Sequence, residues 1–432
     1  MLTLEVKNGE YIFHGRSMQI TKEKNALLAP YNKMVLNYGV ILQLLPLVAQ
    51  ESNINQQIGN ARFVRNDYLH KREEMYKDSK TTLTVADYKS NYLPKLKEDN
   101  QFLNLSDKFA LEAAVEHVQA AYDKFFDNLK NGRKAGFPKF ASKYKLNGNA
   151  YTTKFTNNNI ELMMVDNVPY VKIPKVGKIR FVLPVGQTIN SILPKNTRIT
   201  SATIRRFNGI YTISLQLERV IDKPEELIEV NRTDVWAMDM GLKDFGIYGN
   251  FEFTEKESNP RFIKVHEKRL RRFQKSLSRK VLRSKNWEKA KLKVAKEQRK
   301  IKNQRRDFHH KLSRKIVDNC NVFICEDLNI QGMVKNHKLS KSISSVGWGQ
   351  FLNFIKYKIE RKGGLFIKVN RFYASSKLCS KCGYKKEDLA LKDRHWICPE
   401  CGAKHDRDEN SKFNLLNEGI RILEADYGIK VT

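Results

Sequence analysis

The stretch Cys398–Leu416, CPECGAKHDRDENSKFNLL, combines a metal-binding pattern, a cluster of acids and the start of a helix. It opens with a Cys-x-x-Cys pair, runs through Asp406 and Asp408, and ends in apolar residues at helical spacing. Two residues between the thiols let both sulfurs reach one tetrahedral ion, so the pair is half of a metal site. The stretch therefore predicts a metal-binding loop joined directly to a helix that begins with carboxylates.

The other half of this metal site is Cys379-Ser-Lys-Cys382, with fifteen residues between the two pairs. Gly383 and Gly402 follow the pairs at positions where the chain must turn around the ion. The doubled pattern favours zinc over a redox-active dithiol. We expect one structural Zn²⁺, with no coordination position left open, on Cys379, Cys382, Cys398 and Cys401.

Length and charge bound the other possibilities. With 432 residues, 41% of them hydrophobic, the chain is long enough for roughly two to four domains. Its net charge of +32 requires an anionic partner, usually a phosphate backbone. The alternative is a ribosome-associated protein or a basic protein that binds anions without specificity. The sequence has no run of eighteen apolar residues and no signal pattern, so we expect a soluble, intracellular protein. Cys320 and Cys325 flank an apolar run and are expected to be buried thiols.

Periodicity divides the chain into regions of different character. Residues 1–20 alternate like strands around an Asn-Gly turn, and 21–131 carry apolar residues at the spacing of helices. Residues 132–230 open with Gly and Pro and then alternate in β-branched runs, which indicates a small β-barrel or sandwich. From 231 onward strands alternate with helices, which predicts an α/β layer.

Basic residues concentrate in one segment of the third region. Between 261 and 315 there are 23 Lys and Arg against four acids, more than an ordinary solvated helix face carries. We expect one or two long helices over 264–315 that contact nucleic acid, and a further basic stripe in the helical region. A solvated face is the alternative reading of that stripe. The expected contact residues are Arg62, Arg65, Arg269, Arg271, Arg272, Lys275, Arg279, Arg305 and Arg306.

Carboxylates end two apolar strands. Asp239 follows VWAM, and Glu326 follows VFIC with Asp327 beside it. A charge at the end of an apolar strand is costly unless it faces a cleft or a metal, although Asp239 could also cap a turn. Asp406 and Asp408 could likewise be N-caps, and the adjacent His405 an accessory group or a loop residue. Together such acids can converge on two divalent ions, which in a nucleic-acid-binding protein indicates phosphodiester hydrolysis.

Several motifs resemble TnpB, the transposon-encoded RNA-guided nucleases that are closely related to compact type V CRISPR effectors. The resemblance covers about residues 53–425 and is most specific from 233 onward. The C-terminal motifs are MDMGLKDFGIY (238–248), FICEDLNIQGM (323–333), YASSKLCSKCG (373–383) and the opening stretch. The earlier ones are NARFVRNDYLHKREE (60–74), GRKAGFPKFASKYK (132–145) and SATIRRFNGIYTISLQLE (201–218).

This resemblance implies a multidomain α+β protein. Residues 21–131 would form a helical recognition domain, and 132–230 a wedge β-barrel with its first strand or strands in 1–20. An RNase H-like α/β domain of the RuvC type would occupy 231–375, basic helices included, and 405–432. The zinc ribbon, which would bind target nucleic acid, would be inserted at 376–404.

The resemblance also implies a catalytic triad of Asp239, Glu326 and Asp408 with two Mg²⁺ or Mn²⁺ ions. Asp408 takes the last place because it stands two residues before Asn410, as in the family's DxN element, and Asp406 is the weaker candidate. The small residues usual after that Asn are replaced by Ser411 and Lys412. The implied reaction is cleavage of double-stranded DNA beside a short flanking motif, guided by a transposon-derived omega RNA or a crRNA.

Other readings stay open at this level. The chain could be a CRISPR effector, because ILQLLPLVAQESNINQQIG (41–59) lengthens the family's N-terminal segment. A guided repressor without cleavage would be expected to lack one of the acids, and a non-guided accessory protein to hold no RNA. The resemblance implies a monomer or homodimer in the prokaryotic cytosol, associated with the nucleoid.

Overall fold

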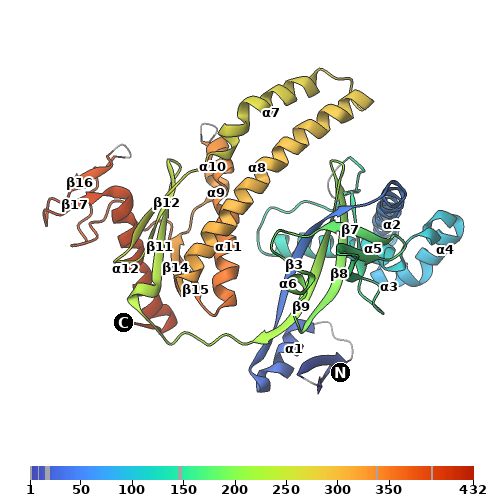
Figure 1. Cartoon of the computed structure of the whole chain (residues 1–432), viewed down its shortest axis with the longest axis horizontal. Coiled ribbons are helices and arrows are strands. Elements are labelled where there is room, and N and C mark those ends of the chain that lie inside the picture. The colour runs from blue at the N-terminus through green and yellow to red at the C-terminus, as the bar shows by residue number, and fades with distance from the viewer. Residues whose placement is uncertain (1, 8, 15–19, 145–147, 337–338, 391–392) are drawn as a thin grey trace. The chain divides into compact units, whose positions relative to one another are not determined.

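The computed structural model describes residues 2–7, 9–14, 20–144, 148–336, 339–390 and 393–432 (Figure 1). The chain forms two compact units, Met1–Lys223 and Pro224–Thr432. Within the described ranges, no helix combines the length and the apolar character needed to cross a bilayer.

The first unit is built on a seven-stranded sheet with the strand order β4-β8-β9-β3-β7-β6-β5. All neighbouring strands described in this sheet pair antiparallel. The strands β4 and β5 lie at its two edges and do not pair with each other, so the described pairing does not close the predicted barrel. Asn208 and Gly209, both at positive φ, join the long strands β8 and β9, as two-residue hairpins require. The strands are β3 (Lys33–Leu45), β4 (Ala150–Lys154), β5 (Glu161–Val165), β6 (Val168–Ile173), β7 (Gly177–Val182), β8 (Thr197–Phe207) and β9 (Ile210–Asp222).

Helices pack on this sheet and on one another (Figure 1). Ile54 and Ile58 of α2 and Ala110 of α5 enter the core of the sheet. A second core, which includes Tyr68 and Tyr88, joins α2 and α5 to the segment between them. The helices are α1 (Ile20–Leu28), α2 (Val48–Ser79), α3 (Val85–Asp87), α4 (Leu93–Asp99), α5 (Lys108–Lys130) and α6 (Ile189–Ile192).

The N-terminal region differs from the sequence prediction in two ways. Residues 33–45, expected to be helical, form β3, which lies inside the sheet and pairs with β9 from Lys33 to Leu44. The first strands, β1 (Thr3–Lys7) and β2 (Glu10–His14), pair only with each other among the described strands, so they do not complete the larger sheet. An apolar run such as VILQLL fits both periodicities, and only its partner strand decides between them.

The second unit is an α/β layer around a five-stranded sheet with the order β13-β12-β11-β14-β15. β11, β14 and β15 are parallel, and β12 and β13 continue the sheet antiparallel. The helix α12 covers one face, and α8, α10 and α11 cover the other (Figure 1). The strands are β11 (Val235–Met240), β12 (Asp244–Gly249), β13 (Thr254–Ser258), β14 (Val322–Glu326) and β15 (Leu365–Val369).

The predicted basic segment is confirmed as two helices. α7 and the first half of α8 pack side by side, and the last turns of α8 join the core through Leu312 and Ile316. A short parallel pair, β10 (Glu229–Val230) and β18 (Lys430–Val431), ties the end of the chain to the start of this unit. The helices are α7 (Phe262–Ser278), α8 (Lys285–Asp318), α9 (Ile330–Val334), α10 (Ser340–Val346), α11 (Trp348–Arg361) and α12 (Arg407–Tyr427).

Candidate functional site

Two of the predicted acids end neighbouring parallel strands. Alternation along β11 puts Asp239 on the same sheet face as Ala237, and alternation along β14 puts Glu326 on the same face as Ile324. Ala237 and Ile324 are paired in register and belong to the core under α12. Asp239 and Glu326 therefore lie next to each other at the carboxyl ends of the strands, on the face that α12 covers.

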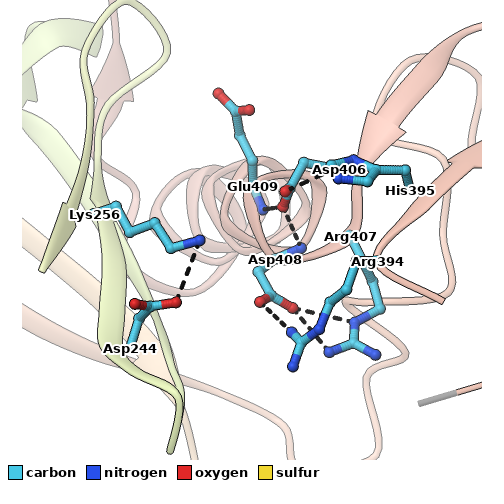
Figure 2. A network of polar contacts seen from close by, with 8 residues as sticks. All are labelled: Asp244, Lys256, Arg394, His395, Asp406, Arg407, Asp408 and Glu409. Carbon is cyan, nitrogen blue, oxygen red and sulfur yellow. Dashed lines mark hydrogen bonds and ion pairs between the residues drawn. The ribbon is translucent and has the colours of Figure 1, made fainter. Parts of the chain in front are cut away.

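The third acid, Asp408, comes from the first turn of α12. The Asp406 carboxylate caps this helix, because its Oδ1 accepts the N–H groups of Asp408 at 3.0 Å and Glu409 at 3.1 Å (Figure 2). The cap fixes where the helix begins and assigns Asp406 a structural role. Asp408 then lies close enough to Asp239 for their charges to interact.

Asp239 has an unusual electrostatic environment. Burial, followed by the negative charges of Glu326 and Asp408, raises the pKa of its carboxyl well above the usual range. Arg407 and a hydrogen bond from Ser411 oppose that rise in pKa only in part. Three carboxylates that repel one another on one face form a donor set that suits a hard divalent cation, which would relieve the repulsion.

Asp408 also has cationic partners. Arg394 donates to its Oδ2, and Arg407 donates to its Oδ1 at 2.9 and 3.1 Å (Figure 2). Within the described ranges, the cysteine set is the only group of three or more potential ligands whose atoms all lie within 4.8 Å of one another. The three acids are thus brought together but not drawn into a tight ligand cluster, and two guanidinium groups balance the charge of Asp408.

Glu326 and Asp327 are adjacent in sequence but have different partners. Ser375 donates a hydrogen bond to Glu326 Oε1. Asp327 forms ion pairs with Lys368 and Arg371, and their hydrogen bonds hold the pKa of its carboxyl below the usual range. The family resemblance selected Glu326 rather than Asp327, and alternation along β14 turns only Glu326 toward the other carboxylates.

The four predicted zinc ligands form a compact cluster. Their sulfurs lie within 4.8 Å of one another, and Cys379–Cys401 and Cys382–Cys398 are each 3.6 Å apart. Sulfurs around a tetrahedral zinc, at about 2.3 Å from the metal, would be roughly 3.8 Å apart, so the set fits zinc. The two halves repeat one turn, because the N–H groups of Gly383 and Gly402, both at positive φ, donate to the first cysteine's carbonyl.

The cysteine cluster is tied to the first turn of α12, which carries Asp408. His405, in β17 (Lys404–Asp406), has its Nε2 3.1 Å from Cys379 Sγ and pairs with Trp396 of β16 (His395–Ile397). Asn410 accepts the N–H of Ser380 and donates to the carbonyl of Leu378 at 2.6 Å. The metal-binding loop and Asp408 therefore share one rigid segment.

Two residues with contacts near the acids were not predicted as site residues from the sequence. Arg394 lies in the loop ahead of β16, and nothing in its sequence position indicates that it reaches Asp408. Lys412 was noted only as a departure from the family pattern, yet it is fully buried on α12. It donates to the carbonyl of Asn250 at 2.6 Å and to Thr254 Oγ1 at 2.7 Å, and burial lowers its pKa to about 8. The sequence offers one signal for the role of Lys412, because a lysine occupies a helix position that is expected to face the sheet.

The predicted nucleic-acid contacts fall into two groups. Arg62 donates to the carbonyl of Gly148, Arg65 is half-buried, and Arg305 donates to the carbonyls of Ser344 and Ser345. Burial lowers the pKa of all three guanidinium groups, and Arg62 and Arg305 bond to backbone carbonyls of their own unit. The exposed group is Arg269, Arg271, Arg272, Lys275, Arg279 and Arg306.

Three family models match separate parts of the chain. "Helix-turn-helix domain" matches residues 34–81, "Probable transposase" matches 219–337, and "Cas12f1-like, TNB domain" matches 348–415. The first segment folds here as strand β3 followed by the single long helix α2. The third segment contains the four cysteines.

The chain is also similar to whole proteins. A Streptomyces pristinaespiralis protein described as "Putative RNA-guided DNA endonuclease" is 28% identical over 89% of this chain and 90% of its own length. The Escherichia coli K12 protein "Putative RNA-guided DNA endonuclease InsQ" is 24% identical over 88% and 92%, respectively. A mimivirus "TnpB-like protein L79" is 27% identical over 32% of this chain and 28% of its own length.

Among solved structures, a chain from "Cryo-EM structure of the Cas12f1-sgRNA-target DNA complex" matches with a TM-score of 0.56. The match covers 90% of this chain and 99% of that one at 14% identity, so it establishes a similarity of fold.

Proposed function

The chain belongs to the TnpB family, which is related to compact type V CRISPR effectors, and from this premise we propose that it is an RNA-guided DNA endonuclease. The observation that carries the proposal is the meeting of Asp239, Glu326 and Asp408 on one sheet face. A guide RNA would select the DNA by base pairing, and the protein would read a short flanking motif.

Asp239, Glu326 and Asp408 would be the catalytic acids of a RuvC-like site. In chain order, the sheet places its strands 3-2-1-4-5, with the acids at the ends of strands 1 and 4, which fits the expected RNase H-like layout. They would hold Mg²⁺, which would supply an activated water and stabilise the leaving oxygen. Ser375 would orient Glu326, and Asp406 would keep Asp408 at the start of its helix.

The zinc ribbon would serve as a structural staple for this site. Four cysteines leave no position for substrate, so its metal would not take part in the reaction. Its contacts through His405 and Asn410 would keep α12 in register and place Arg394 beside Asp408. We propose that residues 376–404 also bind target nucleic acid, because Arg394 of this segment reaches Asp408.

The remaining regions would hold the guide RNA and the target DNA. The exposed Arg and Lys on α7 and α8 supply cations for phosphates without sequence preference. We propose that the first unit combines the recognition helices with the wedge-type sheet, where β3 replaces the N-terminal strands assigned to it from sequence.

The proposal is tested by purifying the chain from cells that carry its native locus and sequencing the RNA bound to it. RNA from a transposon end identifies a TnpB guide, and RNA with repeat and spacer segments identifies a CRISPR effector. The same preparation should cut a plasmid that carries the guide-matched sequence when Mg²⁺ is added. Absence of discrete RNA after a high-salt wash would contradict a guided mechanism.

A further inference from the structure

The first unit carries an aromatic pocket that is lined by residues of that unit alone. The ends of α2 and α5 and the segment after α5 enclose a cavity of about 530 Å³. Tyr76, Phe126 and Phe137 line it with 56%, 56% and 49% of their surfaces exposed. Exposed aromatic rings that converge on one cavity are uncommon on a surface that serves only to enclose a core.

The pocket is preorganised by ring contacts. Tyr122 is buried at the base of the pocket. The centre of its ring lies 5.4 Å from that of Phe137, edge to face, and 6.4 Å from that of Phe126, in a stacked arrangement. The Arg72 guanidinium lies 4.1 Å from the centre of the Tyr122 ring and donates to Tyr68 OH at 3.1 Å. The inner wall is therefore fixed, whereas Tyr76, Phe126 and Phe137 present open ring surface.

Charge around the pocket selects the kind of partner. Residues 124–143 contain six Lys and Arg, all exposed, against one acid, Asp127. These cations alternate with the exposed side chains of Phe126, Phe137 and Phe140. Basic residues interleaved with exposed aromatics suit a single-stranded nucleic acid, whose backbone is anionic and whose bases stack. A cationic peptide would be repelled by the same surroundings.

One polar group inside the pocket suggests a preference among the bases. The Glu73 carboxylate lines the cavity, and no hydrogen bond or ion pair in the described part of the chain engages it. A free carboxylate accepts hydrogen bonds from an exocyclic amino group, which adenine, cytosine and guanine have and uracil and thymine lack. It also disfavours a phosphate inside the pocket, so phosphates would remain with the lysines outside.

We propose that this pocket, between the ends of α2 and α5, binds one unpaired, amino-bearing nucleobase of a single-stranded nucleic acid. The base would stack on Phe126 and Tyr76, and Glu73 would accept its amino hydrogens. The inference rests on the proposed function, because it requires a nucleic-acid partner. It adds direct recognition of a nucleobase, which phosphate contacts alone do not provide.

The test uses the full-length protein, freed of bound nucleic acid, and labelled single strands of about twelve nucleotides of A, C or U, as RNA and as DNA. Phe126→Ala should weaken binding of the A strand roughly tenfold without changing the salt dependence, because stacking releases no counterions. Phe126→Tyr should restore binding. The matched control is Leu129→Ala, which removes an apolar side chain of the same helix that is 53% exposed and does not line the pocket.

Glu73→Met provides a second readout. The wild-type protein should bind A or C strands more tightly than U strands, and this ratio should fall toward one in the variant. A loss confined to RNA or to DNA supports the pocket and identifies which strand enters it. Equal affinities for Phe126→Ala and wild type would overturn the proposal.

Three further outcomes separate the alternatives. If Phe126→Ala turns a dimer into a monomer while its affinity for nucleic acid is unchanged, the pocket is a protein interface and the proposal fails. If wild type binds no nucleic acid, the pocket and the proposed function fail together. If wild type binds and cuts but the pocket variants are indistinguishable from it, only the pocket inference fails.

Discussion

The charge balance around Asp239 differs from that of the acids near it. Asp327 is paired with Lys368 and Arg371, and Asp408 with Arg394 and Arg407. Asp239 instead faces two further carboxylates in a poorly solvated position. Such an arrangement costs stability in the metal-free protein and is retained where a cation is to be bound.

Replacing Asp239 should therefore separate stability from activity. Asp239→Asn removes one repelling charge, so in a chelating buffer at neutral pH its melting temperature should exceed that of wild type. The free energy of unfolding should rise, because the folded variant no longer holds a third carboxylate beside Glu326 and Asp408. Calorimetry measures this gain, and plasmid cleavage with Mg²⁺ should be undetectable.

The matched control is Asp327→Asn on the neighbouring strand end. It loses two ion pairs, so its melting temperature should fall slightly while cleavage continues. Cleavage by Asp239→Asn at the wild-type rate would exclude Asp239 from the catalytic set. Glu326→Ala should likewise abolish cleavage while nucleic-acid binding is retained.

At the scale of elements, α12 and the cysteine loop behave as one piece. His405, the middle residue of β17, contacts Cys379, and Asp406, the last residue of this strand, caps α12. A hydrogen bond to a ligand sulfur typically stabilises the metal-bound thiolate. The contact thus couples occupancy of the metal site to the position of Asp408.

His405→Phe should weaken zinc binding about 10- to 100-fold, the usual effect of removing such a partner. Phenylalanine keeps a ring against Trp396, which lies 4.7 Å from the His405 ring, so packing is conserved. Zinc release to a colorimetric chelator provides the measurement. His395→Phe, on the adjacent strand but 80% exposed, should release zinc as wild type does, and identical release by all three proteins would rule out the role of His405.

The packing of α8 against α11 depends on a neutral histidine. His309 is fully buried, its Nε2 lies 2.9 Å from the carbonyl of Val346, and Phe245 and Phe351 surround it. Burial is the main cause that lowers the pKa of His309 to about 4, helped by the charge of Arg305. As the pH falls, the unfolded chain binds this proton near pH 6.5, whereas the folded protein binds it only near pH 4.

Stability should consequently be highest above pH 6.5 and fall as the pH decreases toward 4. The histidine alone accounts for a loss of about 3 kcal/mol across this window. Urea unfolding at several pH values should show a shallower decline for His309→Gln than for wild type. His310, whose pKa burial also lowers to about 4, remains in the variant and leaves a residual slope. Parallel curves would contradict this account.

At the scale of the whole molecule, a net charge of +32 makes electrostatics the dominant long-range force. The structure divides the arginines between two uses, because some donate to carbonyls inside a unit and others extend into solvent. Only the second kind can release counterions from a phosphate backbone.

Arg272→Gln and Arg305→Gln test this division. Arg272 is exposed on α7, so its variant should lower the slope of log affinity against log salt by about one while its melting temperature is unchanged. Arg305 holds the carbonyls of Ser344 and Ser345, so its variant should melt earlier with the slope unchanged. Filter binding over a salt series measures the slope, and the reverse pattern would contradict the assignment.

The features that depend on local spacing could be predicted from the sequence. The cysteine pairs and their glycines, the strands that end at Asp239 and Glu326, the two basic helices and the start of α12 all followed from short patterns. These patterns suffice because two-residue knuckles, alternation and helical periodicity are set by backbone geometry.

The partners of those features could not be predicted and follow from the folded structure. It placed β3 inside the first unit's sheet, turned Glu326 but not Asp327 toward the acids, and brought Arg394 to Asp408. It also brought together the aromatic rings of α2 and α5 around one cavity. Strand partners, ion pairs between distant residues and shared pockets depend on which surfaces meet, and no local pattern of the chain encodes that choice.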